Sequence, residues 1–297
     1  MYVEELLGGS WASGGALAET IESGLRDQYG LNDPSIVRYG RWMYRMLLEG
    51  DMGVSLEFQK PVTDVIGERL LLTVILAVVT ALFAWGLAVP IGIYSAVRQH
   101  SPEDYIFTFV GFLGLAVPDF LLALWLLWIS FAYFDQSVGG LFSPEYLNAP
   151  WTWGRVVDLV AHLWIAALVV GTAGTAALIR VMRANLLDEL SRPYVETARA
   201  KGLPEWKVLL KYPVRLALNP FVSSAGLELP RLISGSLIVA TVMSLPTLGP
   251  LLLRALLSQD MYMAGSIVMI LTVLTLLGVL ISDIILALMD PRIRMGG

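Results

Sequence analysis

The sequence predicts an all-α integral membrane protein, and its composition, its uncharged stretches and the placement of its charges each support this fold class. Of the 297 residues, 56% are hydrophobic and only 15% are charged, and the mean hydropathy is +0.68. A soluble domain typically carries about 25% charged residues. The composition therefore argues against soluble enzymes, nucleic-acid-binding proteins and disordered chains. With no Cys and two distant His, the chain also lacks the residues for disulfides, thiolate metal sites or a catalytic zinc cluster.

Five apolar stretches are long enough to cross a bilayer, which requires about 20 mostly apolar residues in a helix. No charged residue lies between Arg69 and Arg98, whereas the fourth stretch is interrupted by Glu228, Pro230 and Arg231. We expect the spans at residues 70–97, 105–134, 157–182, 217–243 and 262–289.

The charges orient these spans. Residues 1–70 carry eleven acidic and six basic side chains, and the remainder of the chain carries fourteen of each. Eight basic residues lie in 180–215, but 135–158 and 246–260 contain one each. Because basic residues are retained on the cytoplasmic side, we expect 180–215 and the C-terminus in the cytoplasm. The chain is then a multi-pass protein of the cell (inner, cytoplasmic) membrane.

The same counting divides the chain into two parts. Residues 1–66 form an acidic segment outside the membrane, and residues 67–297 form the membrane domain. The outer segment is expected to contain short helices at Ala16–Tyr29 and Pro34–Glu49. Nothing before Arg69 is long and apolar enough for a signal anchor. Either the first long span inserts with its N-terminus outside, or a further helix lies upstream of this sequence, and we expect the latter.

The cytoplasmic loop at residues 184–216 contains the clearest local signals. Ser191 can cap a helix, Pro193 fits its first turn, and Glu196 complements the positive end of the helix dipole. Gly202 is suited to the position after the helix end. The loop is thus expected to contain a short helix lying along the membrane, although an ordinary amphipathic loop helix would give the same signals.

The motif Glu196-Thr197-Ala198-x₃-Gly202 resembles the E-A-A-x₃-G motif of permease subunits of binding-protein-dependent ABC importers. The resemblance covers nearly the whole chain and is closest to the first permease subunit of the dipeptide/oligopeptide branch. The segments that carry it are GDMGVS at 50–55, YVETARAKGL at 194–203, SLPTLGPLLLRAL at 244–256 and ALMDPRIR at 287–294. There are two departures: Thr197 replaces an Ala, and residues 239–243 (VATVM) lack the acidic residue of the V-E-T-V-F segment frequent in that branch.

The resemblance implies a function and partners. In this family the motif forms a coupling helix that docks on the ATPase subunit, here implicating Tyr194, Glu196, Thr197, Ala198, Arg199, Lys201 and Gly202. The chain would form half of a translocation pathway, together with a second homologous permease subunit, two ATPase subunits and an extracytoplasmic substrate-binding protein. Di- or oligopeptides are the expected substrates, and oligosaccharides or nickel are the alternatives.

Four charged residues lie at or near membrane depth, where a charge costs at least about 2.5–3.5 kcal/mol and should face protein or water. They are Asp119, Glu228, Arg231 and Asp283. All four could line the pathway. Structural roles are the alternative: Glu228 and Arg231 can pair on one helix face, Asp119 can bond backbone freed by Pro118, and Asp283 can reach the interface.

The chain does not contain the sequence of an ATPase site. A phosphate-binding loop needs Gly-Lys-Ser/Thr, and none of the four lysines follows Gly. ATP and Mg are therefore expected on partner subunits, with no catalytic residue, metal or cofactor on this chain. Two other classes stay open: an ion-coupled secondary transporter using Asp119, Glu228 and Asp283, and a non-transporting membrane scaffold.

Overall fold

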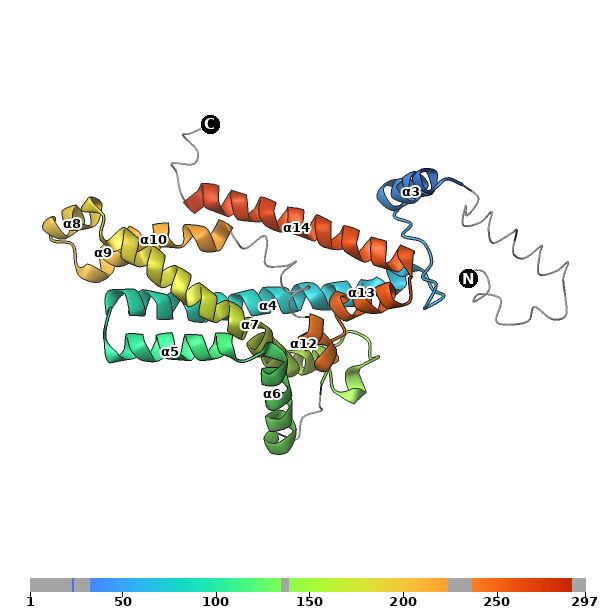
Figure 1. Ribbon diagram of the computed structural model, residues 1–297, viewed down its shortest axis with the longest axis horizontal. Coiled ribbons are helices and arrows are strands. Elements are labelled where there is room, and N and C mark those ends of the chain that lie inside the picture. Colours follow the sequence, from blue (N-terminus) through green and yellow to red (C-terminus); the bar gives the residue numbers. More distant parts are fainter. Residues whose placement is uncertain (1–22, 24–32, 135–138, 224–236, 290–297) are drawn as a thin grey trace.

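The computed structural model describes residue 23 and residues 33–134, 139–223 and 237–289, and in these ranges the chain is helical with connecting turns (Figure 1). The elements, in chain order, are α3 (Ser35–Tyr44), the π-helix η1 (Arg45–Glu49), α4 (Val62–Val97), α5 (Pro102–Ala116), α6 (Asp119–Phe134), the 3₁₀ turn η2 (Pro144–Tyr146), α7 (Trp153–Leu190), α8 (Pro193–Ala200), α9 (Glu205–Lys211), α10 (Pro213–Ala217), α12 (Leu237–Val242), α13 (Leu248–Leu257) and α14 (Met261–Met289).

Three helices have a segment long and apolar enough to cross a membrane: α4, the Trp153–Thr172 part of α7, and α14. The expected spans at 70–97, 157–182 and 262–289 each lie inside one of these helices. Because α7 continues to Leu190, the first residues of the 184–216 loop are an extension of that helix.

The stretch expected as a single span at 105–134 is two helices, α5 and α6, bent by 98°. The bend lies at Val117 and Pro118. Proline disfavours a helical conformation in the residue before it, and Val117 is accordingly extended, with φ −83° and ψ 122°. We therefore correct the prediction of one span here to two helices separated by a sharp break.

The other expected elements are described only in part. Of the expected span at 217–243, the structure describes residues up to 223 and then α12, so its central portion lies outside the described residues. The helix expected at Pro34–Glu49 is present as α3 and η1. The helix expected at Ala16–Tyr29 lies outside the described residues, apart from residue 23.

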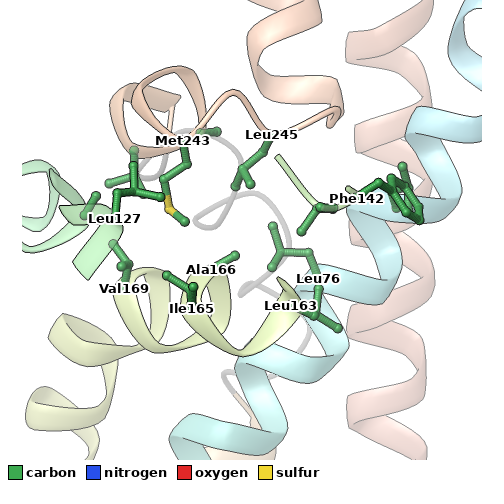
Figure 2. Packing of buried hydrophobic residues seen from close by; sticks show 14 of the residues in the cluster. Leu76, Leu127, Phe142, Leu163, Ile165, Ala166, Val169, Met243 and Leu245 are labelled. Atoms are coloured by element: carbon green, nitrogen blue, oxygen red, sulfur yellow. The ribbon is translucent and has the colours of Figure 1, made fainter. Parts of the chain in front are cut away.

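The packing is organised around α4 and α7, which share the most extensive interface, with α5 alongside α7 (Figure 1). The two backbones approach closely at Gly92, where an added Cβ would lie 2.6 Å from Cβ of Met182. Small residues permit such an approach between membrane helices. Farther along the pair, α6 and α12 close a buried apolar cluster that includes Leu76, Leu127 and Met243 (Figure 2).

The outer faces of the helices are apolar. Leu276 on α14, Phe109 on α5 and Trp128 on α6 are each more than half exposed. Exposed apolar faces of this extent are typical of contact with lipid or a partner subunit. The chain is therefore an integral membrane protein whose polar functional groups have to be sought at the two ends of the bundle. The helices α8 and α9 lie at one end, and α3 and α13 lie at the other (Figure 1).

Candidate functional site

The α8–α9 unit, residues 193–211, is a pair of short helices beyond the end of α7 (Figure 1). Pro193 occupies the first turn of α8, as expected. The residue at the N-cap position is Arg192, and the prediction that Ser191 caps the helix is wrong. Ser191 is instead the C-cap residue that follows α7, and its hydroxyl donates to the carbonyl of Asp188 at 2.8 Å.

Gly202 turns the chain between the two helices. It has a φ of +74°, a conformation that costs a residue with a Cβ about 1–2 kcal/mol. An added Cβ would meet nothing within 4 Å, so the requirement for glycine here comes from the backbone and not from crowding. This confirms the prediction that Gly202 occupies the position after the helix end.

The inner face of the unit is a small apolar core. Val195 and Ala198 of α8 are buried against Val208 of α9. Tyr194 and Tyr212 close the sides of this core, with ring centroids 6.4 Å apart. Because these few side chains fill the space between α8 and α9, a larger side chain at Ala198 would push the two helices apart.

The outer face is charged and exposed, and it carries the rest of the predicted coupling set: Glu196, Thr197, Arg199 and Lys201. Arg199 bonds Glu205 across the turn, with the closest N–O distance 2.6 Å. This hydrogen bond holds the pKa of the Glu205 carboxyl below its ordinary value. Trp206 and Leu210 of α9 are 61% and 58% exposed, so apolar surface lies close to the charges.

Two contacts join this unit to the long helices. The hydroxyl of Tyr194 donates to Oε2 of Glu189, near the end of α7, at 2.6 Å. On the other side α10 follows α9 directly, and its Val214 packs in a cluster with Met182 and Leu186 of α7. A displacement of α8 would therefore reach α7 by two routes.

The residues expected to line a pathway are not gathered into one site. Asp119 is half-buried at the start of α6, and its side chain forms no hydrogen bond or ion pair within the described part of the chain. Asp283 is exposed on α14. Glu228 and Arg231 lie outside the described residues, so their pairing stays a prediction.

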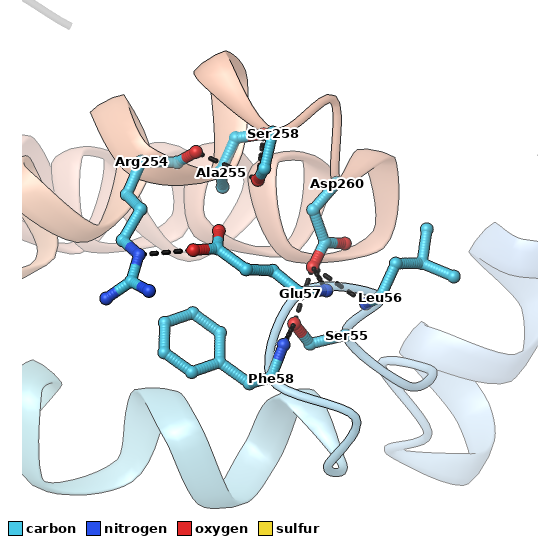
Figure 3. Close-up of polar contacts among 8 residues, drawn as sticks. All are labelled: Ser55, Leu56, Glu57, Phe58, Arg254, Ala255, Ser258 and Asp260. Atoms are coloured by element: carbon cyan, nitrogen blue, oxygen red, sulfur yellow. Dashed lines mark hydrogen bonds and ion pairs between the residues drawn. The ribbon is translucent and has the colours of Figure 1, made fainter. Parts of the chain in front are cut away.

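A polar cluster at the other end of the bundle was not expected (Figure 3). Asp260 immediately precedes α14 and is 1% exposed. Its Oδ2 accepts from the Ser55 hydroxyl at 2.5 Å and from the Leu56 N–H at 2.9 Å, and its Oδ1 accepts from the Met263 N–H at 3.1 Å. The Asp260 cluster (Ser55, Leu56, Glu57, Arg254, Asp260, Met263) thus ties the segment before α4 to the start of α14.

The cluster is continued by an ion pair between Arg254 of α13 and Glu57. The Arg254 guanidinium also lies over the ring of Phe58, with 4.8 Å between Cζ and the centroid. One part of this arrangement had a signal in the sequence, because an Asp immediately before a long apolar run is a preferred helix cap. The contact of Asp260 with Ser55 and Leu56, more than 200 residues away, had no signal in the sequence.

Comparisons with known proteins agree with this architecture. Residues 88–295 match the family described as "Binding-protein-dependent transport system inner membrane component". The chain is 38% identical over 272 residues to the oligopeptide transport system permease protein AppB of Bacillus subtilis, covering 90% of this chain and 83% of that protein. It is 28% identical over 284 residues to the dipeptide transport system permease protein DppB of Escherichia coli, with the same coverages.

Among solved structures, a chain of the MetNI methionine ABC transporter in an inward-facing conformation has the same fold. The TM-score is 0.57 at 16% identity, covering 76% of this chain and 96% of that chain. At this identity the likeness supports the fold alone. The family match begins in the last third of α4, runs through the α8–α9 unit and extends beyond the end of α14, so it includes the candidate site. The chain belongs to the family of binding-protein-dependent transport system inner membrane components.

Proposed function

We propose that this chain forms half of the translocation pathway of an ATP-driven importer of di- or oligopeptides, and that separate ATPase subunits drive it through α8. A second homologous permease subunit completes the pathway, and an extracytoplasmic binding protein delivers the peptide above residues 1–66. The names of the relatives AppB and DppB support the substrate class. ATP and Mg bind the ATPase subunits, and this chain performs no covalent chemistry.

The observation that carries the proposal is the construction of the α8–α9 unit. Its buried face is filled by its own core, and its exposed face presents Glu196, Arg199 and Lys201 beside Trp206. The Tyr194–Glu189 hydrogen bond and the packing of α10 join the unit to α7. A partner that moved this face would therefore move a helix long enough to cross the membrane.

Two substitutions test the proposal in proteoliposomes that contain all subunits. Ala198→Trp opens the core between α8 and α9, whereas Gly202→Asp leaves that core intact and adds a carboxylate to the exposed turn. Both should abolish ATP-dependent uptake of a radiolabelled tripeptide while membrane insertion and ATP hydrolysis persist. Because Gly202 has open space around it, its variant reports mainly on docking.

Gln99 offers matched controls, since it is exposed in the α4–α5 turn and belongs to no part of the α8–α9 unit. Gln99→Trp and Gln99→Asp should import at the wild-type rate. Wild-type import by both α8–α9 variants would refute coupling through this unit. Uptake that resists vanadate but collapses with ionophores would identify an ion-coupled transporter instead.

A further inference from the structure

A small open pocket of about 60 Å³ lies between α3, the turn at residues 51–53 and the start of α14. Its lining consists of Arg38, Arg41, Trp42, Arg45, Asp51, Gly53 and Tyr262, and we call it the arginine pocket. It lies at the same end of the bundle as the Asp260 cluster, which fixes the neighbouring residues Ser55 and Met263.

Three arginines reach one pocket because of their spacing. Arg38, Arg41 and Arg45 follow one another at intervals of three and four residues through α3 and η1, which places them on one face of the helix. Arg41 pairs with Asp33 at 2.8 Å. Arg38 and Arg45 form no ion pair among the described residues, so two guanidinium groups are available to a ligand.

The charge of the pocket sets the charge of the ligand that it fits. Three arginines are opposed by two aspartates, Asp33 on Arg41 and Asp51 in the lining, where Asp51 accepts from the Gly53 N–H at 2.9 Å. Among the described residues, one positive charge therefore remains. A single carboxylate would neutralise it, whereas a phosphate monoester, with a charge near −2, would exceed it.

The aromatic side of the pocket is held in place by α14. The ring of Trp42 lies against Gly265, where an added Cβ would be 3.1 Å from the indole. The Trp42 indole N–H is buried and has no hydrogen-bond partner in the described structure. Trp42 is thus held in the wall of the pocket by its packing on Gly265, and the polar groups that remain open to a ligand are the two guanidinium groups.

We propose that the arginine pocket binds one carboxylate group, held by the guanidinium groups of Arg38 and Arg45. Guanidinium and carboxylate form planar, two-point hydrogen bonds, which is the strongest polar contact that these side chains offer. The proposal rests on the proposed function for its location outside the membrane. The carboxylate is then the C-terminus of an arriving peptide or an acidic side chain of the docked binding protein.

Direct binding tests the chemistry without any need for transport. The probe is N-acetylglycine, and N-acetylglycinamide is its neutral control, each titrated into the purified membrane complex. The readout is the change in tryptophan emission that is lost in Trp42→Phe. We expect saturable binding of the acid alone, weakened at least tenfold in the double variant R38Q/R45Q. Lys60→Gln removes a positive charge from an exposed position close by in the sequence and outside the lining, and should leave binding unchanged.

Transport and docking then identify the source of the carboxylate. If it is the peptide, R38Q/R45Q slows uptake of a free-acid tripeptide at least fivefold but not of its C-terminal amide, and the binding protein docks normally. If it belongs to the binding protein, the variant weakens docking on nanodiscs at least tenfold and slows both peptides alike.

Equal responses to N-acetylglycine and N-acetylglycinamide, or wild-type binding by R38Q/R45Q, would overturn the proposal.

Asp51→Asn provides a second test if the double variant does not assemble. It keeps an oxygen for the Gly53 N–H and makes the pocket more positive, so it should tighten N-acetylglycine binding severalfold. Unchanged or weaker binding in that variant would likewise overturn the proposal. Absence of ATP-driven uptake by the wild-type complex would instead refute the proposed function and leave the binding result standing.

Discussion

At one end of the bundle, the Asp260 cluster fixes a loop with a buried carboxylate whose hydrogen bonds come from segments more than 200 residues apart. At the other end, the α8–α9 unit is joined to α7 by the Tyr194–Glu189 hydrogen bond and by the packing of α10, and its own ion pair is half exposed. Hydrogen bonds to a buried charge contribute more to stability than exposed pairs do. We infer that the first end is built to stay fixed and the second to be moved by a partner.

The largest effect is expected at the fixed end, for Asp260→Ala. The substitution leaves the Ser55 hydroxyl and the Leu56 N–H without their acceptor, and should cost about 3–5 kcal/mol of local stability. Hydrogen exchange at the Leu56 and Met263 amides, which donate to Asp260, measures this directly. Asp260→Asn keeps an acceptor oxygen and should cost less. Equal protection in wild type and Asp260→Ala would remove the distinction between the two ends.

The sequence predicts the parts of this comparison that depend on local patterns. The long spans follow from uncharged stretches, and the α8 helix and the Gly202 turn follow from Pro193, Glu196 and a glycine at the helix end. What joins the ends to the bundle could not be predicted. Asp260 bonds Ser55, and Tyr194 bonds Glu189, only because the fold brings their elements together. Nothing in a single sequence records that proximity.

The error at residues 105–134 has a similar origin. Hydropathy measures the length of an apolar stretch and takes no account of Pro118. Its effect on the preceding residue, Val117, is what bends the span by 98°. In the arginine pocket, the spacing of the three arginines was present in the sequence. Their availability depends on Asp33 and Asp51, and it became apparent only in three dimensions.

A smaller effect is expected for Tyr194→Phe at the movable end. The lost hydroxyl donates to a carboxylate, so the change should weaken the attachment of α8 to α7 by about 1.5–3 kcal/mol. ATP hydrolysis should continue while peptide uptake falls. Tyr212→Phe is the matched control, because that hydroxyl has no hydrogen-bond partner in the described residues and its loss should cost under about 0.5 kcal/mol. If the two variants behave alike, the Tyr194–Glu189 bond does not connect the unit to α7.

The turn between α8 and α9 should be less sensitive still. Gly202→Ala places a Cβ at a φ of +74°, which should cost about 1 kcal/mol through the backbone alone, since no neighbour crowds the site. Gly202→Asn should cost less, because asparagine tolerates the left-handed region better. Amide exchange across residues 199–205 measures both. If Gly202→Asn, with the larger side chain, loses more stability than Gly202→Ala, this explanation is contradicted.

The smallest effect is a pH dependence of the Arg199–Glu205 pair. Because Arg199 lowers the pKa of Glu205 in the folded chain, the pair stabilises the turn at all pH values above the ordinary glutamate pKa of 4.5. That stability is lost as the pH falls from 4.5 through the lower, folded value, and no change is expected between pH 7 and pH 6. Both side chains are about half exposed, so the loss should stay below about 1 kcal/mol.

Amide protection at residues 199–205, corrected for intrinsic exchange, should therefore fall slightly in acid. The decline should be absent in Glu205→Gln and in Arg199→Gln but retained in Lys201→Gln, which removes a neighbouring charge and leaves the pair intact. A decline that persists in Glu205→Gln would assign the acid sensitivity to another carboxylate.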